Sequence, residues 1–140
     1  MSVEENKAMV RRDIEEVFNK GDLSLVDEII APNWVFYGPG GVERKGREGF
    51  KQIVTMLRNA FPDLHMTIED MVAEGDMVAV RYMMRGTFKG ELMGMAPTGN
   101  QFTMTSALFI RFEDGKEIEV REIYDQLTVF QQLGISPPGQ

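Results

Sequence analysis

The stretch QFTMTSALFIRFEDGKEIEVREIYDQL, residues 101–127, decides the fold. At its centre stand Asp114 and Gly115, between two runs that are rich in β-branched, aromatic and alternating apolar residues. An Asp-Gly pair in this setting is the strongest short-range signal of a β-hairpin. We therefore expect two long antiparallel strands, residues 101–113 and 117–127, and strands of this length twist into a curved sheet.

Three more segments towards the N-terminus read as strands. Residues 66–73 and 77–88 show the period of two that is typical of strands, and Glu74-Gly75-Asp76 between them predicts a tight turn. Residues 33–37 form a shorter apolar and aromatic run. Residues 89–100 carry four glycines or prolines and are expected to be a loop.

The first third of the chain is predicted to be helical. Val10, Ile14, Val17 and Phe18 share one helical face within residues 4–19, a short helix follows Asp22 and ends before residue 32, and a third covers residues 46–60. Helices followed by strands indicate an α+β fold. We expect N-terminal helices packed on a curved antiparallel sheet, a half-barrel with an internal pocket. Residues 1–134 would form one domain, and residues 135–140 a flexible tail.

Composition excludes several classes of function. The net charge of −7 disfavours a nucleic-acid partner, because phosphate backbones are also negative. No apolar run is long enough to span a membrane and the N-terminus does not read as a signal peptide, so a cytoplasmic location is expected. Without cysteine, and with His65 as the only histidine, the chain offers no thiolate nucleophile and no site of several histidines for zinc.

Several motifs occur in a fixed order and spacing across residues 6–134. They are Ala60-Phe61-Pro62-Asp63-Leu64, Glu74-Gly75-Asp76, Pro97-Thr98-Gly99, Asp114-Gly115-Lys116 and Gln131-Gln132-Leu133-Gly134. Together they resemble the SnoaL-like polyketide cyclase (ester cyclase) family, which has the nuclear transport factor 2-like fold. The resemblance implies a cone-shaped domain with an apolar cavity, a homodimer, and an aldol condensation that closes the last ring of an aromatic polyketide. It implies no metal and no organic cofactor.

The resemblance also implies an acid–base aspartate on the last strand, which corresponds to Asp125. The family often has histidine where this chain has Tyr37 and Phe88, and Glu-His-Trp where it has Glu119-Val120-Arg121. These departures leave two alternatives open. One is a ligand-binding domain that kept the cavity and lost the chemistry. The other is a different reaction on the same fold, by an isomerase, a dehydratase or an epoxide hydrolase.

In the leading hypothesis Asp125 takes a proton from an acidic C–H group and then returns it to the new alkoxide. The alternative is a carboxylate at the strand end paired with a cation. Alternation places Arg121 on the same strand face, where it could position an anionic ligand or stabilise an enolate. Equally, Glu119, Arg121 and Asp125 could form a row of ion pairs on the outer face.

The remaining candidates would line the pocket for a small apolar molecule. Tyr37 could donate a hydrogen bond to a ligand oxygen, and Trp34 and Phe88 supply aromatic walls. Met93 is one of eleven methionines, whose flexible thioethers suit a bulky flat ligand. The alternative for the methionines is ordinary filling of the core.

Overall fold

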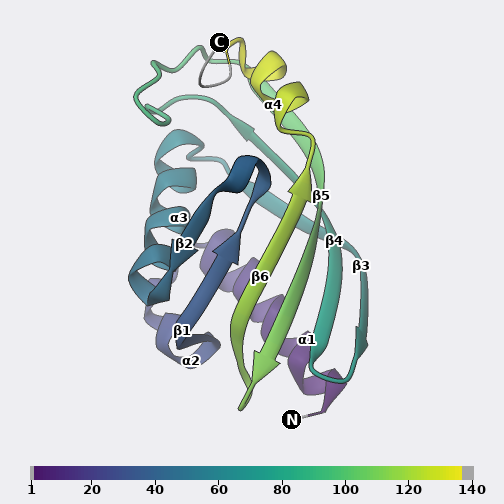
Figure 1. Ribbon diagram of the computed structural model, residues 1–140. Helices are drawn as coiled ribbons and strands as arrows, with labels where there is room; N and C mark the ends of the chain where they lie inside the picture. The colour runs from purple at the N-terminus through teal and green to yellow at the C-terminus, as the bar shows by residue number, and fades with distance from the viewer. Residues whose placement is uncertain (1, 137–140) are drawn as a thin grey trace.

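The computed structural model describes residues 2–136, in which six strands form one curved sheet (Figure 1). The helices are α1 (Val3–Arg12), which continues as one π-helical turn (Asp13–Phe18), α2 (Val26–Ile29), α3 (Gly46–Ala60) and α4 (Gln126–Leu133). The strands are β1 (Ile30–Tyr37), β2 (Glu43–Lys45), β3 (His65–Glu74), β4 (Met77–Thr87), β5 (Gln101–Glu113) and β6 (Lys116–Tyr124).

The strands lie in the order β2-β1-β6-β5-β4-β3. Both predicted hairpins, β3–β4 and β5–β6, are antiparallel neighbours. β1 instead runs parallel to β6, so that Phe36 lies opposite Val120. The sheet is therefore mixed, and the expectation of a purely antiparallel sheet is wrong at this one pairing. The α+β class and the curved sheet are confirmed.

Two elements escape the sequence prediction. β2 has only three residues, all charged, and pairs with β1 at the edge of the sheet. The predicted last strand ends at Tyr124, not at residue 127, because Asp125 caps a helix that the alternating pattern concealed. Conversely, the short second helix ends at Ile29, and Ile30 already belongs to β1.

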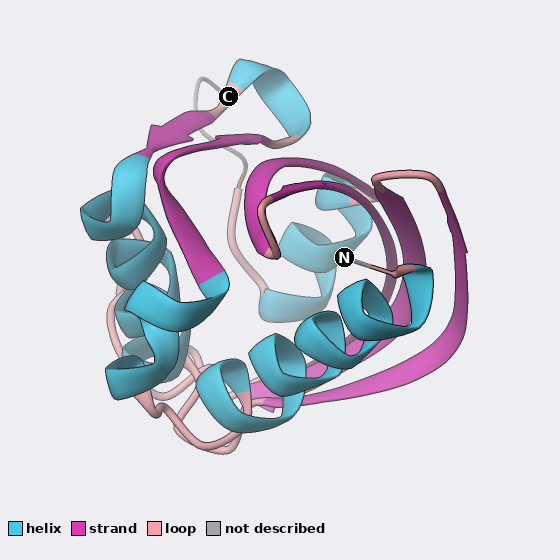
Figure 2. Cartoon of the chain, turned by 90° about the horizontal axis from the view of Figure 1, so that it is seen from below, coloured by secondary structure: helices cyan, strands magenta, loops and turns pink. Residues whose placement is uncertain are grey.

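Helices close the concave side of the sheet. Figure 2 shows α1 and α3 lying across the space that the strands curl around. Ser2 and Glu5 form a capping box at the start of α1, which satisfies backbone N–H groups that the helix leaves free. Val10, Ile14 and Val17 point into the core, where Trp34 and Phe50 meet edge to face with ring centroids 5.3 Å apart.

The loop between β4 and β5 is held against the end of α3. The backbone N–H groups of Lys89 and Gly90 both donate to the carbonyl of Ala60. Gly90 leaves no room for a side chain, since a Cβ atom there would lie 2.0 Å from the Asn59 carbonyl oxygen. This attachment fixes the start of the loop that carries Met93 over the open end of the sheet.

No helix within residues 2–136 has the length and apolar character needed to cross a membrane. Most of the predicted tail, residues 135–140, lies outside the described residues.

Candidate functional site

A cavity of about 160 Å³ lies between the concave face of the sheet, α3, α4 and the loop after β4. Its wall is mostly apolar and is rich in aromatic and methionine side chains, including Phe36, Met56, Phe61, Met84, Met93, Phe102, Met104 and Phe130. Typical small-molecule sites measure about 300–1,000 Å³, so a ligand of several rings needs the wall to rearrange. Methionine side chains are well suited to such rearrangement.

Among residues 2–136, Glu122 is the one acidic residue that lines this cavity. β6 places Glu122 opposite Leu108 of β5, on the concave face. Tyr82 donates its hydroxyl to Glu122 Oε2 at 2.5 Å, and Ser106 donates to the same oxygen at 2.9 Å. Both donors are buried, and they lie opposite each other on β4 and β5. Glu122 Oε1 receives no hydrogen bond from a described residue and is left to the cavity.

Burial raises the pKa of Glu122, while the hydrogen bonds from Tyr82 and Ser106 lower it in part. Burial also raises the pKa of Tyr82, and the negative charge of Glu122 adds to that rise. Tyr82 therefore stays protonated and acts as a donor. Desolvation is what makes a carboxylate a stronger base, so this site holds a base with one free oxygen.

Tyr124 and Gln126 also line the cavity, just beyond Glu122. Tyr124 follows Glu122 by two residues on the same strand, hence on the same face. Burial raises the pKa of Tyr124, the charge of Glu122 raises it further, and a hydrogen bond with Gln126 opposes the rise. A protonated phenol here can donate to a ligand oxygen close to the carboxyl group.

Asp125 does not line the cavity. Its Oδ1 accepts from the backbone N–H of Thr128 at 3.0 Å, and its Oδ2 accepts from the Thr128 hydroxyl at 2.6 Å. These hydrogen bonds make Asp125 the N-cap of α4 and lower its pKa. Asp125 is exposed, so the carboxylate is ionised, solvated and held by its own helix.

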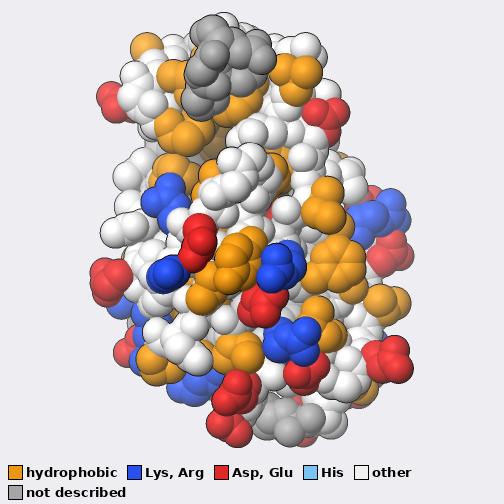
Figure 3. Space-filling model, viewed as in Figure 1, with side chains coloured by type: hydrophobic (Ala, Val, Ile, Leu, Met, Phe, Trp, Pro, Cys, Tyr) orange, Lys and Arg blue, Asp and Glu red, His pale blue; other side chains and the backbone are white. Residues whose placement is uncertain are grey.

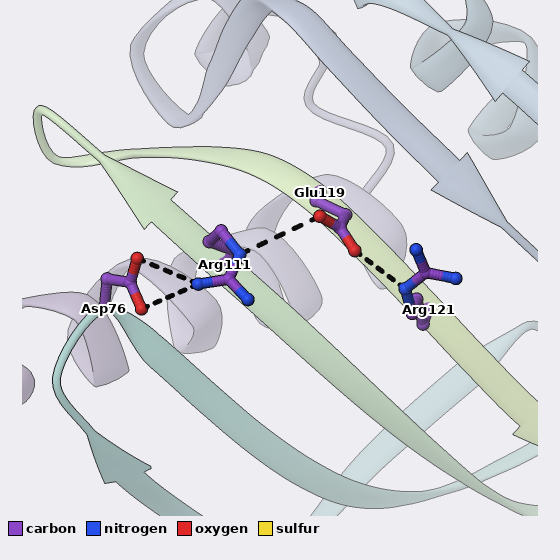
Figure 4. Close-up of polar contacts among 4 residues, drawn as sticks. All are labelled: Asp76, Arg111, Glu119 and Arg121. Atoms are coloured by element: carbon purple, nitrogen blue, oxygen red, sulfur yellow. Dashed lines mark hydrogen bonds and ion pairs between the residues drawn. The ribbon is translucent and has the colours of Figure 1, made fainter.

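Arg121 and Tyr37 lie together on the outer face of the sheet. The guanidinium of Arg121 stands 4.4 Å from the centre of the Tyr37 ring, and its Nε donates to Glu119 Oε1 at 2.7 Å. Charged and apolar groups alternate over this face (Figure 3). Figure 4 shows the row of ion pairs continuing from Glu119 through Arg111 to Asp76.

Of the other three residues predicted to line the pocket, one lies in the cavity wall and two lie in the core. Met93 lines the main cavity and is 54% exposed, with a positive φ of 50°. Phe88 is fully buried against Phe61 and does not line this cavity. Trp34 is buried and borders a second, inner cavity of about 70 Å³.

The inner cavity holds two buried carboxyl groups that the sequence analysis did not single out. Asp13 of the π-helical turn and Glu117 of β6 share a hydrogen bond, which requires that one of them is protonated. Burial raises the pKa of Asp13 to about 7, and burial together with the charge of Asp13 raises that of Glu117 further. Asp13 Oδ1, Glu117 Oε2 and Trp34 Nε1 are buried without a partner in the described residues. Nowhere in residues 2–136 do three or more His, Asp or Glu side chains come together in a group that could hold a metal ion.

Glu122 and Arg44 are the two charged residues of the cavity wall among the described residues, and the sequence analysis missed both. A signal for Glu122 existed: it is the one charged residue between Val120 and Tyr124 on an alternating face. The prediction chose the other face because it started from Asp125. For Arg44 no usable signal existed, since β2 is too short for its alternation to be read.

Comparison with known proteins identifies the family of this chain. The family model of the SnoaL-like polyketide cyclases matches residues 8–133. The aklanonic acid methyl ester cyclase DnrD of Streptomyces peucetius is 32% identical over 131 residues, which cover 90% of this chain and 88% of that protein.

Two solved structures are similar over nearly the whole chain. IdmH of Streptomyces antibioticus, a putative polyketide cyclase, is 37% identical with a TM-score of 0.79 and covers 93% of this chain and 99% of that one. A SnoaL-like protein from Jannaschia has a TM-score of 0.87 at 24% identity, over 96% of this chain and 94% of that one, and bears on the fold alone. The chain thus belongs to the family of SnoaL-like polyketide cyclases.

Proposed function

We propose that this protein closes a ring of a polyketide by an aldol-type reaction and that Glu122 is its acid–base residue. The observation that carries the proposal is a carboxyl group with a raised pKa and one free oxygen in a cavity walled by aromatic and methionine side chains. DnrD, a relative at 32% identity, is named an aklanonic acid methyl ester cyclase, which supports a related carbonyl substrate here.

The chemistry needs one carboxyl group in two states. Glu122 Oε1 removes a proton from a C–H group beside a carbonyl, and the enolate carbon attacks a second carbonyl to form the C–C bond. The resulting alkoxide then takes the proton back from Glu122, so the enzyme returns to its starting state. Tyr124 is placed to donate a hydrogen bond to the developing oxyanion. No cofactor takes part in these steps.

Asp125 was the acid–base candidate from sequence. Its hydrogen bonds to Thr128 and its lowered pKa support a role in starting α4 instead, because an exposed, ionised cap is a weak base outside the cavity. α4 in turn supplies Val129, Phe130 and Leu133 to the wall.

Exchange of the acidic proton tests the function directly. Wild-type protein in deuterium oxide is expected to incorporate deuterium at the acidic carbon of aromatic polyketide esters and to release the ring-closed product, as followed by NMR and mass spectrometry. Binding without exchange and without product would contradict catalysis. That result would favour a ligand-binding domain.

We also propose that the protein is a cytoplasmic homodimer that pairs through the outer face of the sheet. Val72 of β3, Phe109 of β5 and Ile123 of β6 are exposed there, and the strand register puts all three on one face of the sheet. Exposed apolar side chains grouped on one face are typical of protein interfaces.

For the dimer, the Ile123→Lys variant is expected to elute as a monomer in size-exclusion chromatography with light scattering. A lysine would place an unpaired charge in the contact. Leu127→Lys, an equally large change at an exposed residue of α4, is the matched control and should leave the dimer intact. A wild-type protein that is monomeric at high concentration would overturn the proposal.

A further inference from the structure

Three hydroxyl-bearing side chains form a row across the concave face of the sheet. Tyr82 of β4 lies opposite Ser106 of β5, and Ser106 lies opposite Tyr124 of β6. Glu122 precedes Tyr124 by two residues and shares its face. Because β5 separates β4 from β6, the backbones of Tyr82 and Glu122 are two strand spacings, roughly 10 Å, apart across the sheet. A side chain as long as tyrosine can span this distance, and the small Ser106 in between leaves it room.

The hydroxyls of Tyr82 and Ser106 converge on one oxygen of Glu122. Both donate to Oε2, at 2.5 Å and 2.9 Å, and both donors are buried. Hydrogen bonds away from water are stronger, so these two hold the carboxyl group in one orientation. A proton on Oε2 would displace one of the two donors. Oε1, which accepts from no described residue, is therefore the oxygen that takes up a proton.

Neutral hydroxyls, and no cation, stabilise the charge of Glu122. Burial raises the pKa of Glu122, and the hydrogen bonds from Tyr82 and Ser106 lower it. Among residues 2–136, no lysine or arginine forms an ion pair with this carboxylate within 4 Å. A paired cation would lower the pKa further and weaken the base, whereas two hydroxyl donors oppose burial only in part.

Few other titratable side chains surround Glu122. Tyr124 of β6 and Arg44 of β2 line the main cavity, while Asp13 and Glu117 line the inner cavity, which Glu122 also borders. Within residues 2–136, neither α3, nor α4, nor the loop after β4 adds a titratable side chain to these walls. These groups stay unchanged in the variants below, so differences between the variants report the two hydroxyls.

We propose that Tyr82 and Ser106 are positioning residues, which keep Glu122 ionised against the cost of burial and leave Oε1 as the one oxygen that carries the proton. The inference deepens the proposed ring closure and rests on it for the reaction. Tyr82 contributes more than Ser106, because its hydrogen bond is shorter and a phenol is a stronger donor to an anion than an alcohol. Both the acidic C–H and the carbonyl that becomes the alkoxide must then come within reach of Oε1.

Carbon-13 NMR of protein labelled at the glutamate carboxyl carbons follows the titration of Glu122 without any substrate, and Glu122→Gln assigns its signal. Tyr82→Phe keeps the ring and should move the titration midpoint of Glu122 to higher pH, because the anion loses a donor. Ser106→Ala should move it in the same direction by less. The matched control Tyr37→Phe removes a hydroxyl on the outer face, leaves the ring beside Arg121, and should titrate as wild type.

The pH profile of ring closure should follow the same order. In Tyr82→Phe the acid limb of kcat/KM should shift to higher pH, so that activity at a fixed pH within this limb falls about 10- to 100-fold, as loss of a hydrogen bond to a charged group implies. Activity should return as the pH is raised. A tyrosine that only filled space would leave the position of the acid limb unchanged.

A titration midpoint of Glu122 that stays the same or falls in Tyr82→Phe would overturn the proposal. Dispersed NMR signals show that the variant is folded, and Ser106→Ala, which removes a single oxygen atom, tests the same shift if Tyr82→Phe does not fold. Failure of the proposed ring closure looks different: the midpoint would still shift in both variants, while wild type would show no deuterium exchange with any polyketide ester.

Discussion

Glu122→Gln is expected to lower kcat for ring closure by about 10²- to 10⁴-fold, the range in which general acid–base catalysis contributes. Glutamine keeps the shape of the side chain and can still accept from Tyr82 and Ser106, but it cannot take up a proton from carbon. Affinity for the substrate should therefore change little. Single-turnover kinetics with separate measurement of the dissociation constant distinguishes the two effects.

Asp125→Asn is the matched control for this prediction. Asparagine is also a good N-cap, so α4 should stay in place and kcat should remain close to that of wild type. Loss of activity in Asp125→Asn with full activity in Glu122→Gln would reverse the assignment. In wild type, kcat/KM should rise with pH through a pKa above the ordinary value of a glutamate, since burial raises the pKa of Glu122.

The second large effect concerns stability and the pair Asp13–Glu117. The pKa of Asp13 rises from 3.8 to about 7 on folding, so the folded protein binds protons that the unfolded chain releases. The free energy of unfolding should then fall as pH rises from about 4 to about 7. Three pKa units correspond to about 4 kcal/mol as an upper figure. Urea unfolding at a series of pH values measures this slope.

Asp13→Asn should flatten the slope and raise stability at pH 8, because an amide stays neutral and can donate to Glu117. Glu117→Gln, which removes the other carboxyl group of the pair, should likewise flatten the pH dependence and raise stability at pH 8. Glu91→Gln, at an exposed loop position, is the control and should leave the slope unchanged. Stability of wild type that does not fall between pH 4 and pH 7 would contradict the prediction.

The parts of the fold that could be predicted from the sequence are mostly those encoded by short stretches of neighbouring residues. The Asp114-Gly115 turn, the period of two in β3 to β6 and the apolar face of α3 are each encoded within a few neighbouring residues. The parallel contact of β1 with β6 is not, because it joins residues from opposite ends of the chain. α4 was missed because Asp125 reads equally well as the continuation of a strand and as a helix cap.

The resemblance predicted the family correctly, but Asp125, the residue chosen from it as the acid–base group, does not line the cavity. The cyclase family was recognised, and Met93 and Trp34 do border cavities. The irregular register between β5 and β6 lies between Glu117 and Glu119, so alternation from Glu119 to Tyr124 is regular and could be counted from the sequence. The prediction failed because it started from Asp125, which lies beyond the end of β6 and caps α4, so its position could not tell which face of the strand turns inward.

The parallel pairing of β1 with β6 has a consequence for how the chain is made. Contacts between sequence-distant segments slow folding, since a long loop must close before they form. On the ribosome, β1 and the buried Asp13 emerge long before β6 and Glu117, their partners. The edge of β1 that pairs with β6 and the carboxyl group of Asp13 therefore stay without these partners during most of translation, and the nascent chain completes its sheet only when its last strand has left the exit tunnel.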